Sequence, residues 1–416
     1  MKFHFNKEQE KQYVKIPFDV PENTESIDVV CLYDKTGGAV IDLALLGPGD
    51  RLLGASGAAR NHIWVSALGS YTGYETLDPP PGEWNILAGL YKLTPEGAEA
   101  EYGIKLTPKS RRLFKGDPHI HTTASDGKAD FSSIISLAWE QRLDFIFLTD
   151  HNTTAQNKLA GPFENLTVIP GVEWTHYNGH ALFLGAENPL EDNYGITDFE
   201  EGKKLIKKAK NAGAFTAIAH PLCHYLSWQW GLDEDTLSLF DGLEVWNGIM
   251  HERNERAIAF WHKLLCEGKK IPATCGSDYH GPGLFGSVGM PCLNVYALSR
   301  SPSDIMAAIR KGNSFISYTP DGPEVDIICE GNGAIGETAV PGAALTFYFA
   351  NLSPGDEIAL ITESETEKIP ANVNGRLILE RVYRDCKFVR AEVYRSYAPG
   401  LPPMKAMLSN PVYFSP

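Results

Sequence analysis

Residues 116–121 read Gly-Asp-Pro-His-Ile-His and begin the part of the chain in which its reactive side chains gather. His119 and His121 are two residues apart, so an extended strand points both imidazoles to the same face. Neutral imidazole is the commonest metal ligand in proteins, and two on one face can bind one ion. An isolated His-x-His pair also occurs at surfaces and in cores without any metal. The residues that follow it decide between these interpretations.

Seven further potential ligands lie at or just beyond short apolar runs: Asp126, His151, Glu173, His180, His220, Asp278 and His280. Asp278 and His280 form a second same-face pair. Functional groups of α/β barrels gather at the carboxyl ends of the strands, and most of these residues follow that rule. His180 departs from it because it begins its apolar run, and a packed strand histidine is the alternative. Asp126 has a turn-capping role as its alternative.

The order of elements predicts three domains in the 416 residues. Residues 1–112 show short alternating runs between turn signals, which predicts an all-β domain, a small sandwich. Residues 113–322 alternate strands and helices, which predicts a distorted β/α barrel. In this part Asp130 is placed to cap one helix, and Pro302 and Gly312 to begin and end another. Residues 323–416 return to β and predict a C-terminal sandwich-like domain.

Composition limits the class of partner and the compartment. The formal charge of −15 argues against nucleic acid as the main partner, because binding phosphates needs clustered Lys and Arg. Neither a signal peptide nor a membrane-spanning apolar run is recognisable. The seven cysteines are scattered without paired spacing, as expected for free thiols. We therefore expect a cytoplasmic protein with no membrane partner.

The motifs resemble those of the PHP (polymerase and histidinol phosphatase) family of metallohydrolases over roughly residues 113–320. The matching stretches are His119-Ile120-His121, Ser125-Asp126-Gly127, Thr149-Asp150-His151-Asn152, Gly171-Val172-Glu173, His180, Ala219-His220-Pro221 and Gly276-Ser277-Asp278-Tyr279-His280. All nine ligand positions of the family pattern are filled in the right order. The long β region before the barrel and the ending Ser-Asn-Pro-Val-Tyr are similar to the branch that includes carbaryl hydrolase.

The resemblance implies two to three divalent ions, of zinc, manganese or iron. It assigns His119, His121, Glu173 and Asp278 to one ion. Glu173 bridges to a second ion, held with His180 and His220. Asp126, His151 and His280 hold the third. Nine His, Asp and Glu ligands without cysteine are too many for a single ion, which agrees with this distribution.

Other residues near these motifs are candidates for roles beside the ligands. Glu173, His220 and Asp150 are the expected catalytic residues, with Asp150 as an acceptor that orients a ligand imidazole. Asn152, His224, Asn247 and Arg253 are candidates for substrate binding, and Glu244 also lies where substrate could be touched. The alternative for Arg253 is a helix-surface arginine that faces water, while a contact with an anionic substrate is the functional interpretation.

The leading function is hydrolysis of a phosphomonoester or phosphodiester by a metal-bound hydroxide at a multinuclear site. Its substrate is then a small anionic molecule, with inorganic phosphate as product or inhibitor. The first alternative is a carbamate, ester or amide hydrolase that uses the same metals. The second is a metal-binding domain without activity, although such domains usually lose ligands and this sequence keeps all nine.

Overall fold

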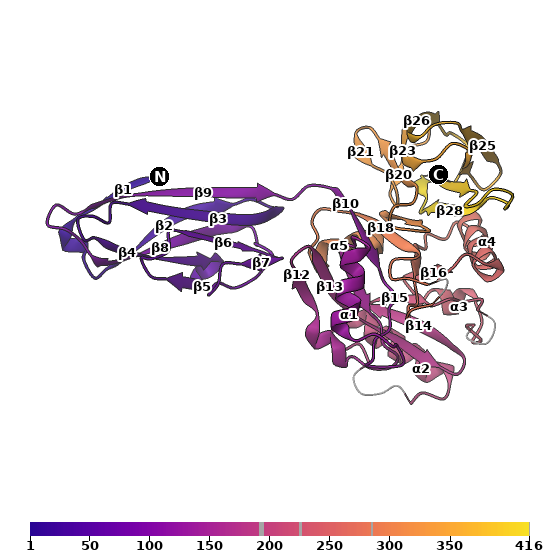
Figure 1. Ribbon diagram of the computed structural model, residues 1–416, viewed down its shortest axis with the longest axis horizontal. Helices are drawn as coiled ribbons and strands as arrows, with labels where there is room; N and C mark the ends of the chain where they lie inside the picture. The colour runs from indigo at the N-terminus through magenta and orange to yellow at the C-terminus, as the bar shows by residue number, and fades with distance from the viewer. Residues whose placement is uncertain (191–194, 224–226, 284–285, 416) are drawn as a thin grey trace. The chain divides into compact units, whose positions relative to one another are not determined.

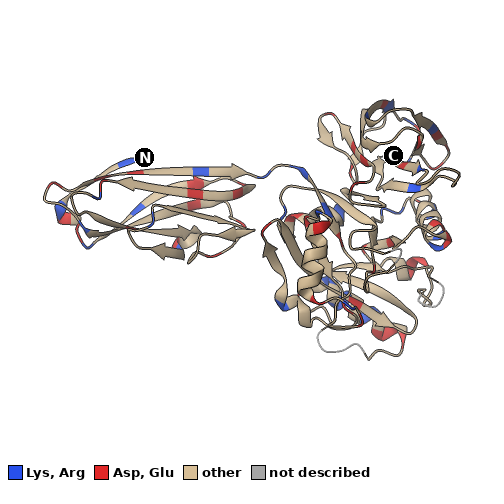
Figure 2. Cartoon of the chain, in the orientation of Figure 1, with Lys and Arg blue, Asp and Glu red and all other residues tan. Residues whose placement is uncertain are grey.

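The computed structural model describes residues 1–190, 195–223, 227–283 and 286–415 of the chain. The chain divides into two compact units, Met1–Arg111 and Arg112–Pro416, shown as ribbons in Figure 1. Lys and Arg lie among Asp and Glu in both units (Figure 2). No described helix combines the length and the apolar character needed to cross a lipid bilayer.

The first unit consists of two β-sheets with strand orders β1-β9-β3-β6-β7 and β2-β8-β4-β5. Alternate residues of β3, namely Ile27, Val29 and Cys31, are buried, and Trp84 and Ile86 of β8 join the same apolar core. One face of each sheet is therefore apolar, as a two-sheet packing requires. The strands are β1 (Lys2–Phe5), β2 (Tyr13–Val20), β3 (Thr24–Tyr33), β4 (Val40–Gly47), β5 (Arg51–Ser56), β6 (His62–Ser66), β7 (Gly69–Ser70), β8 (Gly82–Lys92) and β9 (Ala98–Pro108).

The second unit is mixed α/β and rich in strands. Its helices are α1 (Phe131–Glu140), α2 (Phe199–Asn211), α3 (Glu234–Leu237), α4 (Glu252–Cys266) and α5 (Pro302–Lys311). The predicted caps are observed: Asp130 accepts a hydrogen bond from the backbone N–H of Ser133, and Gly312 ends α5 with a φ of 73°. Both residue types suit these positions, because an Asp oxygen satisfies a free N–H and glycine tolerates left-handed backbone.

The strands that carry the predicted ligands form a series in the order β17-β16-β15-β14-β13-β11-β10. They are β10 (Arg112–Asp117), β11 (Phe145–Leu148), β13 (Leu166–His176), β14 (Gly179–Leu184), β15 (Phe215–Ile218), β16 (Gly242–Asn247) and β17 (Ala273–Gly276). Among the described residues, β10 and β17 share no strand ladder; just beyond their ends, Ile120 and Tyr279 form an isolated bridge, and the N–H of Asp278 bonds to the carbonyl of His119 at 2.9 Å. The ladders thus trace an open path, and the closed barrel stays a prediction.

The same sheet continues from β10 through strands that lie on both sides of the predicted boundary at residue 322. The order is β10-β18-β19-β28-β27-β24-β25, and β19 pairs with β28 in antiparallel register. The remaining strands of the unit are β12 (Gly161–Phe163), β18 (Cys292–Ala297), β19 (Ser314–Ser317), β20 (Glu324–Cys329), β21 (Asn332–Gly333), β22 (Thr338–Ala339), β23 (Ala344–Leu352), β24 (Asp356–Ile361), β25 (Thr366–Ala371), β26 (Gly375–Val382), β27 (Phe388–Arg395), β28 (Met404–Ser409) and β29 (Val412–Phe414).

Candidate metal centre

The predicted ligands meet at one edge of the strand series. His119 and His121 follow β10, His151 follows β11, Glu173 lies in β13 and His220 follows β15. β14 runs antiparallel to both of its neighbours, β13 and β15. The start of β14 therefore lies at the edge where those strands end, which explains why His180 reaches the cluster although it begins its strand.

Glu173 lies at the middle of the cluster, and its side chain is only 1% exposed. Its Oε1 is 2.8 Å from Nδ1 of His180 and 3.0 Å from Nε2 of His220. Its Oε2 is 2.9 Å from Nδ1 of His151 and 3.3 Å from Nε2 of both His119 and His121. Each carboxylate oxygen thus faces a different group of imidazoles, as a carboxylate that bridges two cations does.

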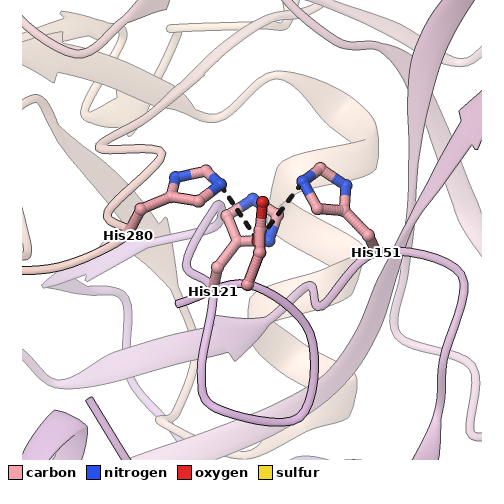
Figure 3. Close-up of side chains that lie close together, drawn as sticks. His121, His151 and His280 are labelled. Atoms are coloured by element: carbon pink, nitrogen blue, oxygen red, sulfur yellow. Dashed lines mark ion pairs between the residues drawn. The ribbon is translucent and has the colours of Figure 1, made fainter. Parts of the chain in front are cut away.

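The donor atoms form three overlapping groups, each with its atoms within 4.8 Å of one another. The inner set is His119, His121, Glu173 and Asp278, the outer set is His121, Asp126, His151 and His280, and the third set is His151, Glu173 and His180. Figure 3 shows the imidazoles of His121, His151 and His280 around one carboxylate. His220 joins through its contact with Glu173. All nine predicted ligands therefore lie in one cluster.

Several buried atoms of the cluster lack a hydrogen-bond partner among the described residues, as expected where a cation would be the partner. Asp278 Oδ1 is one of them, although Nε2 of His121 lies 3.0 Å away. The Nε2 atoms of His119 and His121 face each other at 3.1 Å. Imidazole and carboxylate donors without cysteine suit divalent zinc, manganese or iron, so the residues present fit the implied ions.

The acidity of these groups shows how strongly the carboxylates favour positive charge here. Burial opposes the charged form of Glu173, but the imidazoles of His119, His121 and His151 outweigh it and hold its pKa well below the usual range. Burial lowers the pKa of His121, yet the neighbouring carboxylates of Asp278 and Glu173 raise it to about 9. A site with this field binds cations readily.

Two buried carboxylates hold the ligands in place: Asp117, which the sequence did not single out, and Glu244, which was expected only where substrate could be touched. Glu244 Oε1 accepts a hydrogen bond from Nδ1 of His119 at 2.9 Å, and its Oε2 accepts one from the backbone N–H of His220 at 2.8 Å. Asp117 Oδ1 accepts from the backbone N–H groups of His119 and Ser277. A signal was present in the sequence, because an acidic residue inside the apolar run 243–246 or two residues before His-x-His needs a buried partner.

Asp150 takes a different role from the predicted one. Its carboxylate accepts hydrogen bonds from the N–H and hydroxyl of Thr122 at 2.7 and 2.8 Å and from the Ser125 hydroxyl at 2.7 Å. Within the described residues these contacts go to the loop that carries Asp126, and none goes to an imidazole. Asp150 therefore fixes the loop that presents a ligand, because buried carboxylates require such donors.

The residues predicted to bind substrate have different surroundings in the structure. Asn247 Nδ2 lies 3.3 Å from Oδ2 of Asp278, at the edge of the cluster. Arg253 is exposed on α4, and its guanidinium donates to the sulfur of Cys223 at 3.4 Å. His224 lies outside the described residues. The Asn152 carboxamide bonds to the backbone of Thr175 through both its oxygen and its nitrogen, and its contact with substrate stays a prediction.

Comparison with known proteins gives similar solved structures. No protein-family model matches the chain, and no curated protein matches it. A two-domain protein from Bacteroides vulgatus, said to contain a predicted PHP-like metal-dependent phosphoesterase, is 18% identical with a TM-score of 0.41, over 72% of this chain and 95% of its own.

Two further structures match a smaller part of the chain. An amidohydrolase from Chromobacterium violaceum is 18% identical with a TM-score of 0.30, over 41% of this chain and 89% of its own. A structure from Bifidobacterium adolescentis, described as a metal-dependent phosphoesterase, is 18% identical with a TM-score of 0.29, over 42% and 90%. The carbaryl hydrolase branch is not among these three, and that finer placement stays a prediction.

Proposed function

We propose that this protein is a metal-dependent hydrolase that cleaves phosphoesters of small molecules. The observation that carries the proposal is the position of Glu173, whose two oxygens face separate groups of imidazoles within three overlapping sets of donors. Two to three divalent ions fit these sets. Such ions, when bound, lower the pKa of water and stabilise the negative charge that develops on phosphoryl oxygens.

The chain's own residues prepare the centre for this chemistry. Glu244 accepts the Nδ1–H of His119, which directs the lone pair of Nε2 toward Glu173 and Asp278. With the proton on Nδ1, the Nε2 atom of the neutral ring keeps the free lone pair that a cation needs. Asp150 holds the loop of Thr122 to Asp126 in place. Ligands fixed in this way need little rearrangement when an ion binds.

Substrate binding falls to the side of the cluster next to α4. His220, Asn247, His251 and Arg253 lie together there, around a hollow with room for about one water molecule. The exposed guanidinium of Arg253 suits a phosphoryl group, because guanidinium binds phosphate oxygens through two parallel hydrogen bonds. A phosphoryl group also offers several charged oxygens to a multinuclear centre, whereas a carbonyl intermediate develops only one. These arguments favour an anionic phosphoester over a carbamate, and they place inorganic phosphate as product and competitive inhibitor.

The test is a side-by-side assay of p-nitrophenyl phosphate, bis-p-nitrophenyl phosphate and an aryl methylcarbamate on one preparation loaded with zinc, manganese or iron. We expect one of the phosphoesters to turn over fastest and inorganic phosphate to inhibit it competitively. Elemental analysis of the same preparation should give more than one ion per chain. Arg253→Ala should raise KM with little change in kcat, because it removes a contact made before the reaction.

Faster turnover of the carbamate without inhibition by phosphate would replace the phosphoesterase with a carbonyl hydrolase at the same centre. Full metal content without turnover of any of the three substrates would favour the non-catalytic metal domain. At most one ion per chain after metal loading would remove the basis of the proposal.

A further inference from the structure

We propose that Asn152 and Thr175 are positioning residues that hold the imidazole of His151 in one orientation and one tautomer. The ion held by the outer set can therefore be lost while the ions held by the buried ligands stay bound. This inference rests on the proposed function, since it concerns the same centre. It assigns to these two residues a role that acts through the imidazole of His151.

Asn152 acts as a clamp between the loop after β11 and the strand β13. Its Oδ1 accepts from the backbone N–H of Thr175 at 2.8 Å, and its Nδ2 donates to the carbonyl of Thr175 at 2.9 Å. Its own N–H donates to the carbonyl of Glu173 at 3.0 Å. A φ of 51° places Asn152 in the left-handed region, where asparagine is among the few side chains that are tolerated. The backbone of His151 is thus fixed relative to Glu173.

The hydroxyl of Thr175 then sets the ring of His151. It donates to the carbonyl of Glu173 at 3.4 Å, so its lone pairs are available to accept the Nδ1–H of His151. Nδ1 of His151 also faces Oε2 of Glu173 at 2.9 Å, which is a second acceptor. A neutral ring with its proton on Nδ1 leaves Nε2 as the free donor, and Nε2 points to Asp126 at 3.6 Å. This is the orientation that the outer set requires.

Exposure explains why the outer set needs such support. The side chains of Asp126, His151 and His280 are 60%, 22% and 38% exposed. Those of His119 and His121 are fully buried, and packing holds their rings. The ring of His151 is partly exposed and lies against the imidazoles of His121, His180 and His280, so hydrogen bonds add to this packing in fixing its orientation. Loss of such a supporting contact typically lowers metal affinity about 10–100-fold.

The experiment is a Co²⁺ titration of the metal-free full-length protein, followed by visible absorption and by elemental analysis after gel filtration. Thr175→Val removes the hydroxyl and keeps the shape, and Thr175→Ser restores the hydroxyl. Asn152→Gly removes the carboxamide and still accepts a positive φ. Thr154→Val makes the same change as Thr175→Val in the neighbouring loop, where the Thr154 side chain makes no capping hydrogen bond. Circular dichroism verifies that each variant is folded.

We expect Thr175→Val and Asn152→Gly to bind one Co²⁺ fewer per chain, or to bind the weakest Co²⁺ about 10–100-fold less tightly. Thr175→Ser and Thr154→Val should titrate like the wild type. A Thr175→Val protein that titrates like the wild type would overturn the inference and leave the proposed function intact. A variant that loses every ion would also overturn it, because the outer set would then not be separate. A wild type that binds no Co²⁺ would overturn the proposed function itself, and with it this inference.

Discussion

Glu173 is the residue on which the centre depends most, because five imidazoles contact its two oxygens. Residues of this kind were predictable from sequence, since ligand types recur at the ends of apolar runs. The buried carboxylates that hold these ligands in place were not predictable from the sequence. Glu244 and Asp117 act through contacts with residues 125 and 160 positions away, and no local pattern encodes such pairs. Asn152 was expected to bind substrate, and the sequence did not show that its carboxamide bonds to the backbone of Thr175, because a carboxamide beside a ligand suits either partner.

The first prediction at this scale concerns Glu173→Gln. A neutral amide binds cations poorly and cannot bridge two of them, so we expect the variant to lose more than one ion per chain. Hydrolysis should fall by orders of magnitude, while circular dichroism stays unchanged. Elemental analysis beside the activity assay measures both effects. Glu187→Gln, at an exposed carboxylate of the same unit, is the matched control and should keep its metal and activity. Near-normal metal content in Glu173→Gln would contradict the bridging role.

The arrangement of strands brings the ligands together, and its parallel part could be inferred from the alternation of strands and helices. The helix caps could also be predicted from local sequence, because an Asp or Pro before an apolar repeat marks a helix start. The direction of β14, by contrast, could not be predicted from its local sequence. A two-residue turn, Tyr177 and Asn178, joins it to β13 as an antiparallel hairpin, and this reversal places His180 beside Glu173. Short apolar runs do not show whether neighbouring strands are parallel.

The close approach of two of these strands gives the next prediction, Gly276→Ala in β17. A Cβ at residue 276 would lie 2.1 Å from Cβ of His119 and 3.1 Å from Oε1 of Glu244. His119 must move, since an atom so near its backbone cannot turn away. We expect weaker metal binding, together with a loss of about 1–3 kcal/mol in the free energy of unfolding. Metal titration and thermal denaturation measure the two effects.

Gly283→Ala is the control for this change, because its added Cβ meets no described atom within 4 Å and its φ is not positive. It should retain the metal affinity and stability of the wild type. Equal behaviour of the two alanine variants would mean that the packing of His119 against β17 does not position the ligand.

For the molecule as a whole, the C-terminal strands β24, β25, β27 and β28 belong to the same sheet as those that carry the ligands, whereas β20, β21, β23 and β26 form a separate sheet. Asn410, in the ending Ser-Asn-Pro-Val-Tyr, accepts from the N–H of Ala273 in β17 at 2.8 Å and donates to its carbonyl at 3.1 Å. The β character of residues 323–416 was predictable from alternation and turns. Their attachment was not, because it depends on pairs more than 130 residues apart.

A buried charge cluster ties these C-terminal strands to α4. The Glu392 carboxylate, 1% exposed, contacts the Arg390 guanidinium, the Lys405 ammonium and the Tyr394 hydroxyl. Arg390 also lies over the ring of Trp261 in α4, 5.3 Å from its centre. Burial raises the pKa of Glu392, but the positive charges of Arg390 and Lys405 outweigh it and lower the pKa to about 2.

This shift predicts how the stability of the second unit depends on pH. The folded pKa of Glu392 lies below the ordinary value of 4.5, so ionised Glu392 stabilises the fold above about pH 4.5. That contribution, roughly 3 kcal/mol, is lost as the pH falls toward 2. Glu392→Gln leaves two buried cations without their counter-charge. We expect it to be less stable than the wild type at neutral pH by about this amount, and the difference to close near pH 2.

Urea denaturation at a series of pH values, followed by circular dichroism, measures the difference between wild type and variant. Taking the difference removes the acid sensitivity that both proteins share, including that of the metal ligands. The control is Glu357→Gln, whose carboxylate pairs with Lys368 at the surface and is 41% exposed. Exposed pairs contribute about 0–1 kcal/mol, so this variant should differ little from the wild type at any pH. If Glu392→Gln were destabilised equally from neutral to acid pH, its lost shape and hydrogen bonds, rather than its charge, would hold the C-terminal strands to α4.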